Sequence, residues 1–240
     1  MPFAAVLHAE WIKIRTLRSL VGSLVAILVA TAAFSALASA SADAGTDDAD
    51  PLFSVFFGIS FGQIAAIAFG TTALSSEFRG GALRLTLAAV PDRRRWFAAK
   101  ATAIALSVLA VGLVTGVVTL LMGKAVLGAS GPTWTEGVRG ALGCGLHLTL
   151  MALFAAGLAA VLRSGVATLS ILIPFLLIVS FVIGDLSAGV ADYLPDRAGQ
   201  VALHSTWDGF LGPWTGLAVT ALWAAAALCA GAWSIQRRDA

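Results

Sequence analysis

The stretch Phe97–Gly123, FAAKATAIALSVLAVGLVTGVVTLLMG, decides the class of this fold, because Lys100 is its only charged residue. About 20 apolar residues in a helix cross the ~30 Å hydrocarbon core of a bilayer. Lipid cannot hydrogen-bond an exposed backbone, so such a segment crosses as a helix. Five further stretches meet the same criterion, near Ser19–Ala40, Leu52–Ser75, Val138–Leu162, Gly165–Gly184 and Trp214–Ile235. The sequence therefore predicts an all-α, polytopic membrane protein with six transmembrane helices.

The composition agrees with a chain whose solvent is lipid. Hydrophobic residues make up 59% of the sequence and charged residues 12%, with a mean hydropathy of +0.91. Soluble domains carry about 45–50% apolar and about 25% charged residues. Cys144 and Cys229 lie far apart in apolar runs, without metal or redox spacing, and are expected to be packing residues. Pro174 lies inside the fifth predicted span and predicts a kink there.

The basic residues fix the expected orientation. If the six spans are correct, 12 of the 15 Lys and Arg residues fall on one side and three on the other, namely Lys124, Arg139 and Arg197. Cytoplasmic loops carry the excess of Lys and Arg. We therefore expect a multi-pass protein of the cell (plasma) membrane with both termini in the cytoplasm. A cleaved signal peptide ending near Ala36–Ala40 is the alternative, but its basic and apolar segments are both long for one.

The segment before the first span, residues 1–18, has the pattern of a helix that lies in the membrane interface. One narrow arc of a 3.6-residue helix collects Phe3, Leu7, Trp11 and Ile14. Trp11 would lie at headgroup depth, with Lys13 and Arg15 directed toward lipid phosphates as interfacial anchors. A frayed terminus whose charges only set the topology is the alternative. Residues 19–240 would then form the six-helix transmembrane domain.

The loop between the second and third spans is the main functional clue. A helix starting near Ser75 or Ser76 would be interrupted by Pro91-Asp92, and Glu77 and Arg84 would share one face of it. An apolar stripe would lie beside them, formed by Phe78, Ala82, Leu85 and Ala89. This pattern predicts a short cytoplasmic amphipathic helix that docks on a soluble partner. Binding to anionic lipid alone is the other interpretation.

These features resemble the permease subunits of ABC-2 type transporters. In that family the second and third spans flank a segment of the form E-x-x-x-G-T/A-L…P-x-x-R…K. The residues that fit it here are Glu77, Gly81, Ala82, Leu83, Pro91, Arg94 and Lys100. The architecture is similar over nearly the whole chain, whereas the motif covers only Glu77–Lys100.

The resemblance implies an assignment for each segment. Phe3–Arg18 would be an elbow helix, Glu77–Ala89 a coupling helix within a cytoplasmic segment 76–96, and residues 186–213 an extracellular re-entrant segment. The residues expected to contact an ATP-binding-cassette subunit are Glu77, Phe78, Arg79, Ala82, Arg84 and Leu85. The chain would form an export pathway as a homo- or heterodimer of permease chains. Gly112, Gly116, Gly143 and Gly157 are small residues of the kind that allow close helix contacts in such a dimer.

ATP hydrolysis is expected on the partner. A phosphate-binding loop needs Gly-x-x-x-x-Gly-Lys-Ser/Thr. The nearest match, Gly123-Lys124, has Val118 in place of the first Gly and Ala125 in place of the Ser or Thr. We therefore expect no cofactor on this chain, with ATP and Mg on the separate subunit. Membrane lipid is a further expected partner, and nucleic acid is not.

Two other classes of function stay open at this stage. A six-helix assembly or lipid-handling protein would share the spans without an ATPase. An intramembrane hydrolase would rest on Ser60, in a Gly-x-Ser-x-Gly sequence, and on His147, although that motif needs a strand–turn–helix context. Packing or interhelical hydrogen bonding is the simpler expectation for His147 and Gln63.

Overall fold

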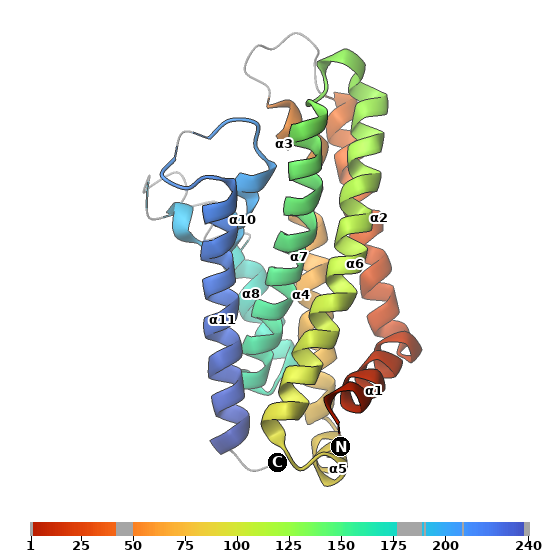
Figure 1. The fold of residues 1–240 in the computed structure, drawn as a ribbon, viewed down its shortest axis with the longest axis vertical. Helices are drawn as coiled ribbons and strands as arrows, with labels where there is room; N and C mark the ends of the chain where they lie inside the picture. Colours follow the sequence, from red (N-terminus) through yellow and green to blue (C-terminus); the bar gives the residue numbers. More distant parts are fainter. Residues whose placement is uncertain (1, 42–49, 177–188, 190, 208, 238–240) are drawn as a thin grey trace.

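The computed structural model describes residues 2–41, 50–176, 189, 191–207 and 209–237, and every element in those ranges is a helix. Figure 1 shows them as one elongated bundle. In chain order the α-helices are α1 Phe3–Thr16, α2 Arg18–Ser41, α3 Pro51–Phe56, α4 Ile59–Ser75, α5 Ala82–Ala89, α6 Arg93–Leu127, α7 Trp134–Leu162, α8 Gly165–Pro174, α10 Pro195–Gln200 and α11 Pro213–Arg237. Short 3-10 helices are η1 Ser76–Phe78, η2 Gly128–Ser130, η4 Ala191–Tyr193 and η5 Val201–Leu203.

Five helices of the described chain are long and apolar enough to cross a membrane. They are α2, α4 continued by η1, α6 continued by η2, α7 and α11. The remaining predicted span, Gly165–Gly184, starts as the ten-residue α8, and its residues 177–184 lie outside the described part. Regular α-helix stops at Pro174, after which Phe175 and Leu176 form a wider, π-helical turn. The all-α fold is thus confirmed for the described residues, and the five long apolar helices are compatible with a multi-pass membrane protein.

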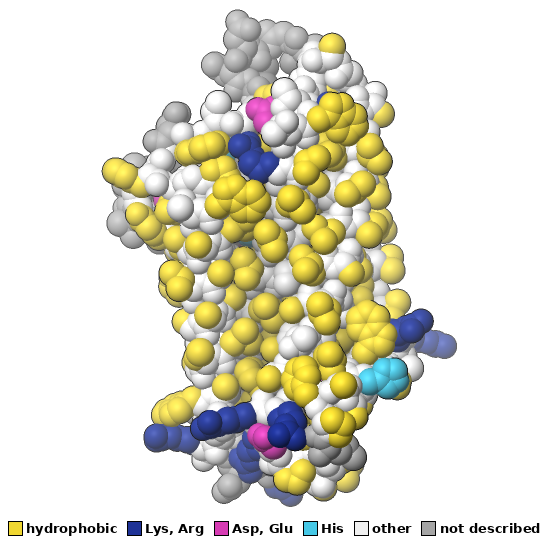
Figure 2. Space-filling model, in the orientation of Figure 1, with side chains coloured by type: hydrophobic (Ala, Val, Ile, Leu, Met, Phe, Trp, Pro, Cys, Tyr) yellow, Lys and Arg dark blue, Asp and Glu magenta, His cyan; other side chains and the backbone are white. Residues whose placement is uncertain are grey.

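Side-chain types divide the surface along the bundle axis. Figure 2 shows apolar side chains over the middle of the bundle, with Lys and Arg gathered mainly at the end that carries α1 and α5. We call that end the basic end. Apolar side chains such as Val25, Val114 and Leu222 remain 53 to 70% exposed along the helices. Exposed apolar surface of this extent fits a bundle surrounded by lipid.

α7 is the central helix, and small residues let its neighbours approach closely. A Cβ at Gly157 would lie 2.5 Å from the carbonyl carbon of Ala227 on α11, and one at Gly116 would lie 2.6 Å from the carbonyl oxygen of Ala141. Gly112 and Gly143 likewise pack within the chain. These four glycines therefore serve contacts inside one chain, and their assignment to contacts in a dimer was wrong. Dimerisation itself stays a prediction.

The second predicted span is broken rather than continuous. α3 ends at Phe56, and α4 starts at Ile59. A side chain at Gly58 would clash with the carbonyl oxygen of Thr31 on α2, and the Gly58 N–H donates to Ser35 Oγ at 3.0 Å. Gly58 lies in the two-residue gap between α3 and α4, and only a residue without Cβ allows this close approach to α2.

Much of the predicted outer segment packs on the bundle. Residues 186–188, 190 and 208 lie outside the described part, but α10 contacts both α11 and α7. Thr220 Oγ1 donates to the Pro195 carbonyl at 2.8 Å, and Trp223 Nε1 donates to that of Tyr193 at 2.9 Å. Pro195 occupies the first turn of α10, where its missing N–H costs nothing.

Candidate functional site at the basic end of the bundle

The loop that carries the coupling motif is a helix–hinge–helix. η1 extends α4 to Phe78, and α5 starts only at Ala82. Between them Gly80 and Gly81 have φ angles of 60° and 75°, a left-handed conformation that ends a helix and favours glycine. The continuous helix predicted over Glu77–Ala89 was therefore wrong in its first half. Phe78 does not share a stripe with Leu85, nor Glu77 a face with Arg84.

The end of this loop agrees with prediction. α5 stops before Pro91, and α6 begins with Asp92 as its N-cap. The Asp92 carboxylate accepts the backbone N–H groups of Arg94 and Arg95, each at 3.1 Å. Neither Ser75 nor Ser76 caps a helix start, since the Ser76 hydroxyl donates to the Ala73 carbonyl at 3.2 Å instead.

Four charged side chains meet beneath this loop, and we call them the ion cluster: Glu10 and Lys13 from α1, Glu77 from η1 and Lys100 from α6. Lys100 Nζ donates to Glu10 Oε2 at 2.6 Å and to Glu77 Oε1 at 2.8 Å. Lys13 Nζ donates to Glu10 Oε1 and Glu77 Oε1, both at 2.9 Å. The two positive and two negative charges cancel. The cluster thus joins three elements that are far apart in sequence.

Three of the four side chains of the ion cluster are buried, so their pairing matters for the stability of the fold. The side chains of Lys100, Glu10 and Glu77 are 2%, 2% and 5% exposed, whereas Lys13 is 36% exposed. A buried charge is tolerated only when it is paired and hydrogen-bonded. Thr86 Oγ1 on α5 adds a hydrogen bond to Glu77 Oε2 at 3.3 Å. Glu77 therefore connects the loop to the bundle and, through Thr86, to α5.

The face of α1 differs from the one predicted. The side chains that α1 buries against the bundle are those of Val6, Glu10 and Ile14, while Phe3 and Trp11 are 41% and 37% exposed. Glu10 occupies a buried position on this face that an apolar residue would ordinarily fill, because its carboxylate pairs with the buried ammonium of Lys100. The sequence analysis did not predict that Glu10 is buried. Its position four residues after Val6 and four before Ile14 places all three on one face of a helix, and this spacing was visible in the sequence.

The three predicted interfacial anchors separate into two groups. Lys13 was expected to face lipid phosphate, but its ammonium binds two carboxylates. Burial opposes the charged form of Lys13, yet the hydrogen bond to Glu77 and the charge of Glu10 outweigh it and raise the pKa of Lys13 above its ordinary value. Trp11 and Arg15 do face outward, and both line a shallow groove on α1.

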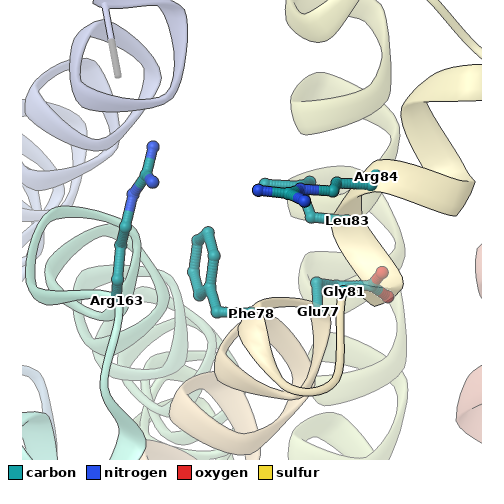
Figure 3. Close-up of a pocket in the computed structure, with 6 residues that line it drawn as sticks. All are labelled: Glu77, Phe78, Gly81, Leu83, Arg84 and Arg163. Atoms are coloured by element: carbon teal, nitrogen blue, oxygen red, sulfur yellow. The ribbon is translucent and has the colours of Figure 1, made fainter. Parts of the chain in front are cut away.

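A pocket of about 360 Å³ opens beside the hinge (Figure 3). It is lined by Glu77, Phe78, Gly81, Leu83, Arg84 and Arg163. Arg163 comes from the turn between α7 and α8, and its Cζ lies 5.6 Å from the centre of the Phe78 ring, within cation–π range. In Figure 3 Arg163 and Arg84 enter from opposite sides of the pocket with Phe78 between them, and the carboxylate of Glu77 points away from both guanidinium groups.

The predicted coupling residues are thus distributed over two surfaces. Phe78 and Arg84 line the pocket, whereas Leu85 projects from α5 with 76% of its surface exposed. The buried apolar residue of α5 is Leu83, at 5% exposure. Arg79 is exposed in the hinge, and Ala82 is half-buried. A partner that reaches this end would meet Leu85 directly, and it would find Glu77 already bound within the chain.

In the bundle interior His147 pairs with Gln63. Its Nε2 lies 3.1 Å from Gln63 Oε1, and both side chains are buried. Gly199 of α10 allows close approach to the other ring nitrogen, since a Cβ there would clash with His147 Nδ1. Among the described residues His147 makes no hydrogen bond to Ser60, and its Nε2 is occupied by Gln63 instead.

The end opposite the ion cluster is held by Asp50. Its carboxylate caps α3 through the N–H groups of Leu52 and Phe53 and accepts the Ser205 N–H at 2.9 Å. His204 Nδ1 lies 3.1 Å away. Burial alone would raise the pKa of Asp50, but the hydrogen bonds from His204, Phe53 and Ser205 outweigh it and hold that pKa well below its usual range.

Two further observations concern metal ions and known proteins. Within the described ranges no group of three or more His, Cys, Asp or Glu side chains is placed to hold a metal ion. Comparison with known proteins finds no protein-family model and no curated protein that matches the chain.

Proposed function

We propose that this chain is the membrane-spanning permease subunit of an ABC-2 type ATP-driven exporter, working with a separate ATP-binding subunit. One observation carries the proposal. A short amphipathic helix, α5, lies at the basic end, between two helices that can cross a membrane. It exposes Leu85, and the hinge before it is held on the bundle by the hydrogen bond from Lys100 to Glu77. An exposed apolar anchor beside basic residues suits a protein partner better than solvent.

The ion cluster gives this helix a path to the rest of the bundle. A displacement of α5 would reach α4 through the hinge and η1, because η1 directly follows α4 in the chain. Glu77 is the middle residue of η1 and would move with it. The carboxylate of Glu77 would pass the same displacement to α1 through Lys13 and to α6 through Lys100. Three helices would then move together when the partner moves α5. Switching between two arrangements of packed helices is the usual form of such a transition.

The remaining assignments belong to the same proposal. The basic end faces the cytoplasm, α1 is the elbow helix, and the exposed Trp11 and Arg15 anchor it in the lipid interface. Two permease chains together form the pathway, because one bundle has α7 packed at its centre. ATP and Mg bind to the partner, and this chain carries out no bond chemistry.

Reconstitution tests the proposal. The chain is co-expressed with an ATP-binding-cassette subunit, purified in detergent and placed in nanodiscs. We expect a complex that contains two permease chains and hydrolyses ATP faster than the ATP-binding subunit does alone. A permease that stays separate from every such subunit tested, or a complex without stimulated hydrolysis, would favour the alternative of a six-helix assembly or lipid-handling protein.

A further inference from the structure

The outward face of α1 carries a groove that the coupling role does not use. The residues that line this groove of about 360 Å³ all belong to α1: His8, Trp11, Ile12, Arg15 and Thr16. Measured from His8 they follow at three, four, seven and eight positions, so they share one face of the helix. α1 packs on the bundle through Val6, Glu10 and Ile14, which lie on the opposite face. The groove therefore opens away from the bundle.

The two basic side chains of this groove have no partner within the described part of the chain. Neither Arg15 nor His8 makes a hydrogen bond, an ion pair or a ring contact with another described residue, and both are exposed. The remaining cation of α1, Lys13, is bound by Glu10 and Glu77 in the ion cluster. Arg15 and His8 are thus the basic residues of α1 that can bind an anion from outside the chain.

The helices packed on α1 do not supply that anion. α1 contacts α6 and α2, and neither of these helices contains an acidic residue. Apart from Lys100 of the ion cluster, their charged residues are Arg18, Arg93, Arg94, Arg95 and Lys124. The carboxylates of Glu10 on α1 and Glu77 on η1 both bind Lys13 and Lys100. The positive charge on the outward face is therefore not cancelled by these groups.

The groove lies at the level where the chain enters the hydrocarbon. α1 ends at Thr16, and the candidate span Arg18–Ser41 starts directly after Leu17. Figure 1 shows α1 on the outside of the bundle at the basic end, turned away from the direction of α2. Trp11 and Ile12 are 37% and 47% exposed in the groove, and tryptophan prefers the depth of the lipid headgroups. Exposed apolar side chains among free cations suit an anion attached to an apolar body.

We infer that this groove binds the headgroup of an anionic membrane lipid, with Arg15 contacting its phosphate and Trp11 and Ile12 contacting its glycerol and upper acyl chains. A guanidinium group binds phosphate oxygens in a bidentate fashion. His8 lies two turns before Arg15, about 10 Å along the helix. Helical side chains lean toward the N-terminus, which brings the guanidinium of Arg15 toward His8. A charged His8 ring is therefore the second contact to the same phosphate.

The contact from His8 makes the site sensitive to pH. A histidine ring is charged at the acid end of the range from about pH 5 to 8 and neutral at the alkaline end. Arginine and a lipid phosphodiester keep their charges over that range. Acidification thus adds one positive charge to the groove. The inference rests on the proposed function only for the position of α1 in the lipid interface, and it goes beyond anchoring because it names the charge of the lipid and the role of His8.

Native mass spectrometry of the full chain in detergent tests the site, with phosphatidylglycerol as the anionic probe and phosphatidylcholine as the neutral one. Wild type should prefer phosphatidylglycerol and bind it up to about fivefold more tightly at about pH 5.5 than at about pH 7.5, since one basic residue near the surface is worth about 1 kcal/mol. Arg15→Gln should weaken that binding about fivefold at both pH values, while Arg15→Lys should retain most of it. His8→Gln should match wild type at the higher pH and lose the gain at the lower one.

Arg18→Gln is the matched control. Arg18 is exposed three positions after Arg15 and is not among the residues that line the groove. This variant should stay within twofold of wild type, a margin of roughly 0.4 kcal/mol. Equal weakening by Arg18→Gln and Arg15→Gln would show a diffuse attraction to the basic end and would overturn the inference.

Three other results would also overturn it. They are equal binding of the two lipids by wild type, an acid gain that persists in His8→Gln, and displacement of the lipid by an excess of inorganic phosphate, which would assign the groove to a soluble anion. The exchanged side chains are all exposed, so unchanged thermal midpoints should confirm that the variants fold. No ATP-binding subunit is present in this experiment. Its failure would therefore leave the exporter proposal standing, and failure to form the exporter complex would leave this site standing.

Discussion

Replacing Lys100 by methionine tests whether the ion cluster holds the elbow helix and the hinge on the bundle. The ammonium is 2% exposed and contacts Glu10 Oε2 at 2.6 Å and Glu77 Oε1 at 2.8 Å. Without it, two buried carboxylates share the single charge of Lys13. Removing one partner of a buried ion pair costs about 3–5 kcal/mol, because the remaining charge is left uncompensated.

Lys13→Met is the matched control. Lys13 contacts the same two carboxylates at 2.9 Å, but 36% of its side chain is exposed. Solvent screens such a pair, which is worth about 1 kcal/mol or less. Lys100→Met should therefore destabilise the protein several times more than Lys13→Met, although both remove one positive charge from one cluster.

The assay is thermal unfolding in detergent, followed by tryptophan fluorescence. For a chain of this length 1 kcal/mol corresponds to about 2–4 °C in the midpoint, so Lys100→Met should lower it by about 6–20 °C. Adding Glu10→Gln to Lys100→Met restores a neutral cluster and should recover most of the loss. The reasoning is refuted if Lys100→Met and Lys13→Met have equal effects, or if the double variant is no more stable than Lys100→Met.

Three further predictions concern orientation, packing and the opposite end of the bundle. In intact cells Asp47→Cys should react with a membrane-impermeant thiol reagent and Arg94→Cys should not, and the reverse pattern would invert the topology. Gly157→Ala should lower the free energy of unfolding by about 1–3 kcal/mol, because the added Cβ meets the backbone of α11. Gly22→Ala is the control and should leave stability unchanged, since nothing lies within 4 Å of its Cβ. Equal thermal midpoints for the two variants would contradict this packing. Asp50→Ala should cost about 2 kcal/mol at neutral pH. Because the folded protein holds the pKa of Asp50 low, that difference from wild type should be full above about pH 4 and shrink as the pH falls below it; a difference that does not change with pH would contradict this role of the carboxylate.

The class of the fold could be predicted because lipid imposes a simple length rule. Stretches such as Phe97–Gly123 are long and apolar, and the structure places the 35-residue α6 over that stretch. The stop at Pro91-Asp92 was likewise predictable, since proline ends α5 and aspartate caps α6. Such local chemistry is visible in sequence because the residues that act are neighbours.

The features that fix the candidate site depend on contacts between distant residues. Glu10 and Lys100 are 90 positions apart, so their ion pair left no local signal. The break between α3 and α4 includes Gly58, which lies close to α2, a contact between residues more than 20 positions apart. The hinge is a different case, because the pair Gly80-Gly81 is a turn signal that was present in the sequence. The predicted helix Glu77–Ala89 was too long because its apolar stripe was continued across these two glycines.

Binding between the permease and its ATP-binding subunit tests the central claim most directly. The measurement is the dissociation constant of that complex in nanodiscs, compared between wild type, Leu85→Asp and Arg95→Gln. Leu85 is 76% exposed, so an aspartate there should leave the permease folded and inserted. The loss of an apolar anchor at the centre of a contact costs about 2 kcal/mol. We expect Leu85→Asp to weaken the complex about 30-fold and to abolish the stimulation of ATP hydrolysis, with Arg95→Gln close to wild type. Wild-type affinity and wild-type stimulation in Leu85→Asp would contradict the assignment of α5 as the coupling helix.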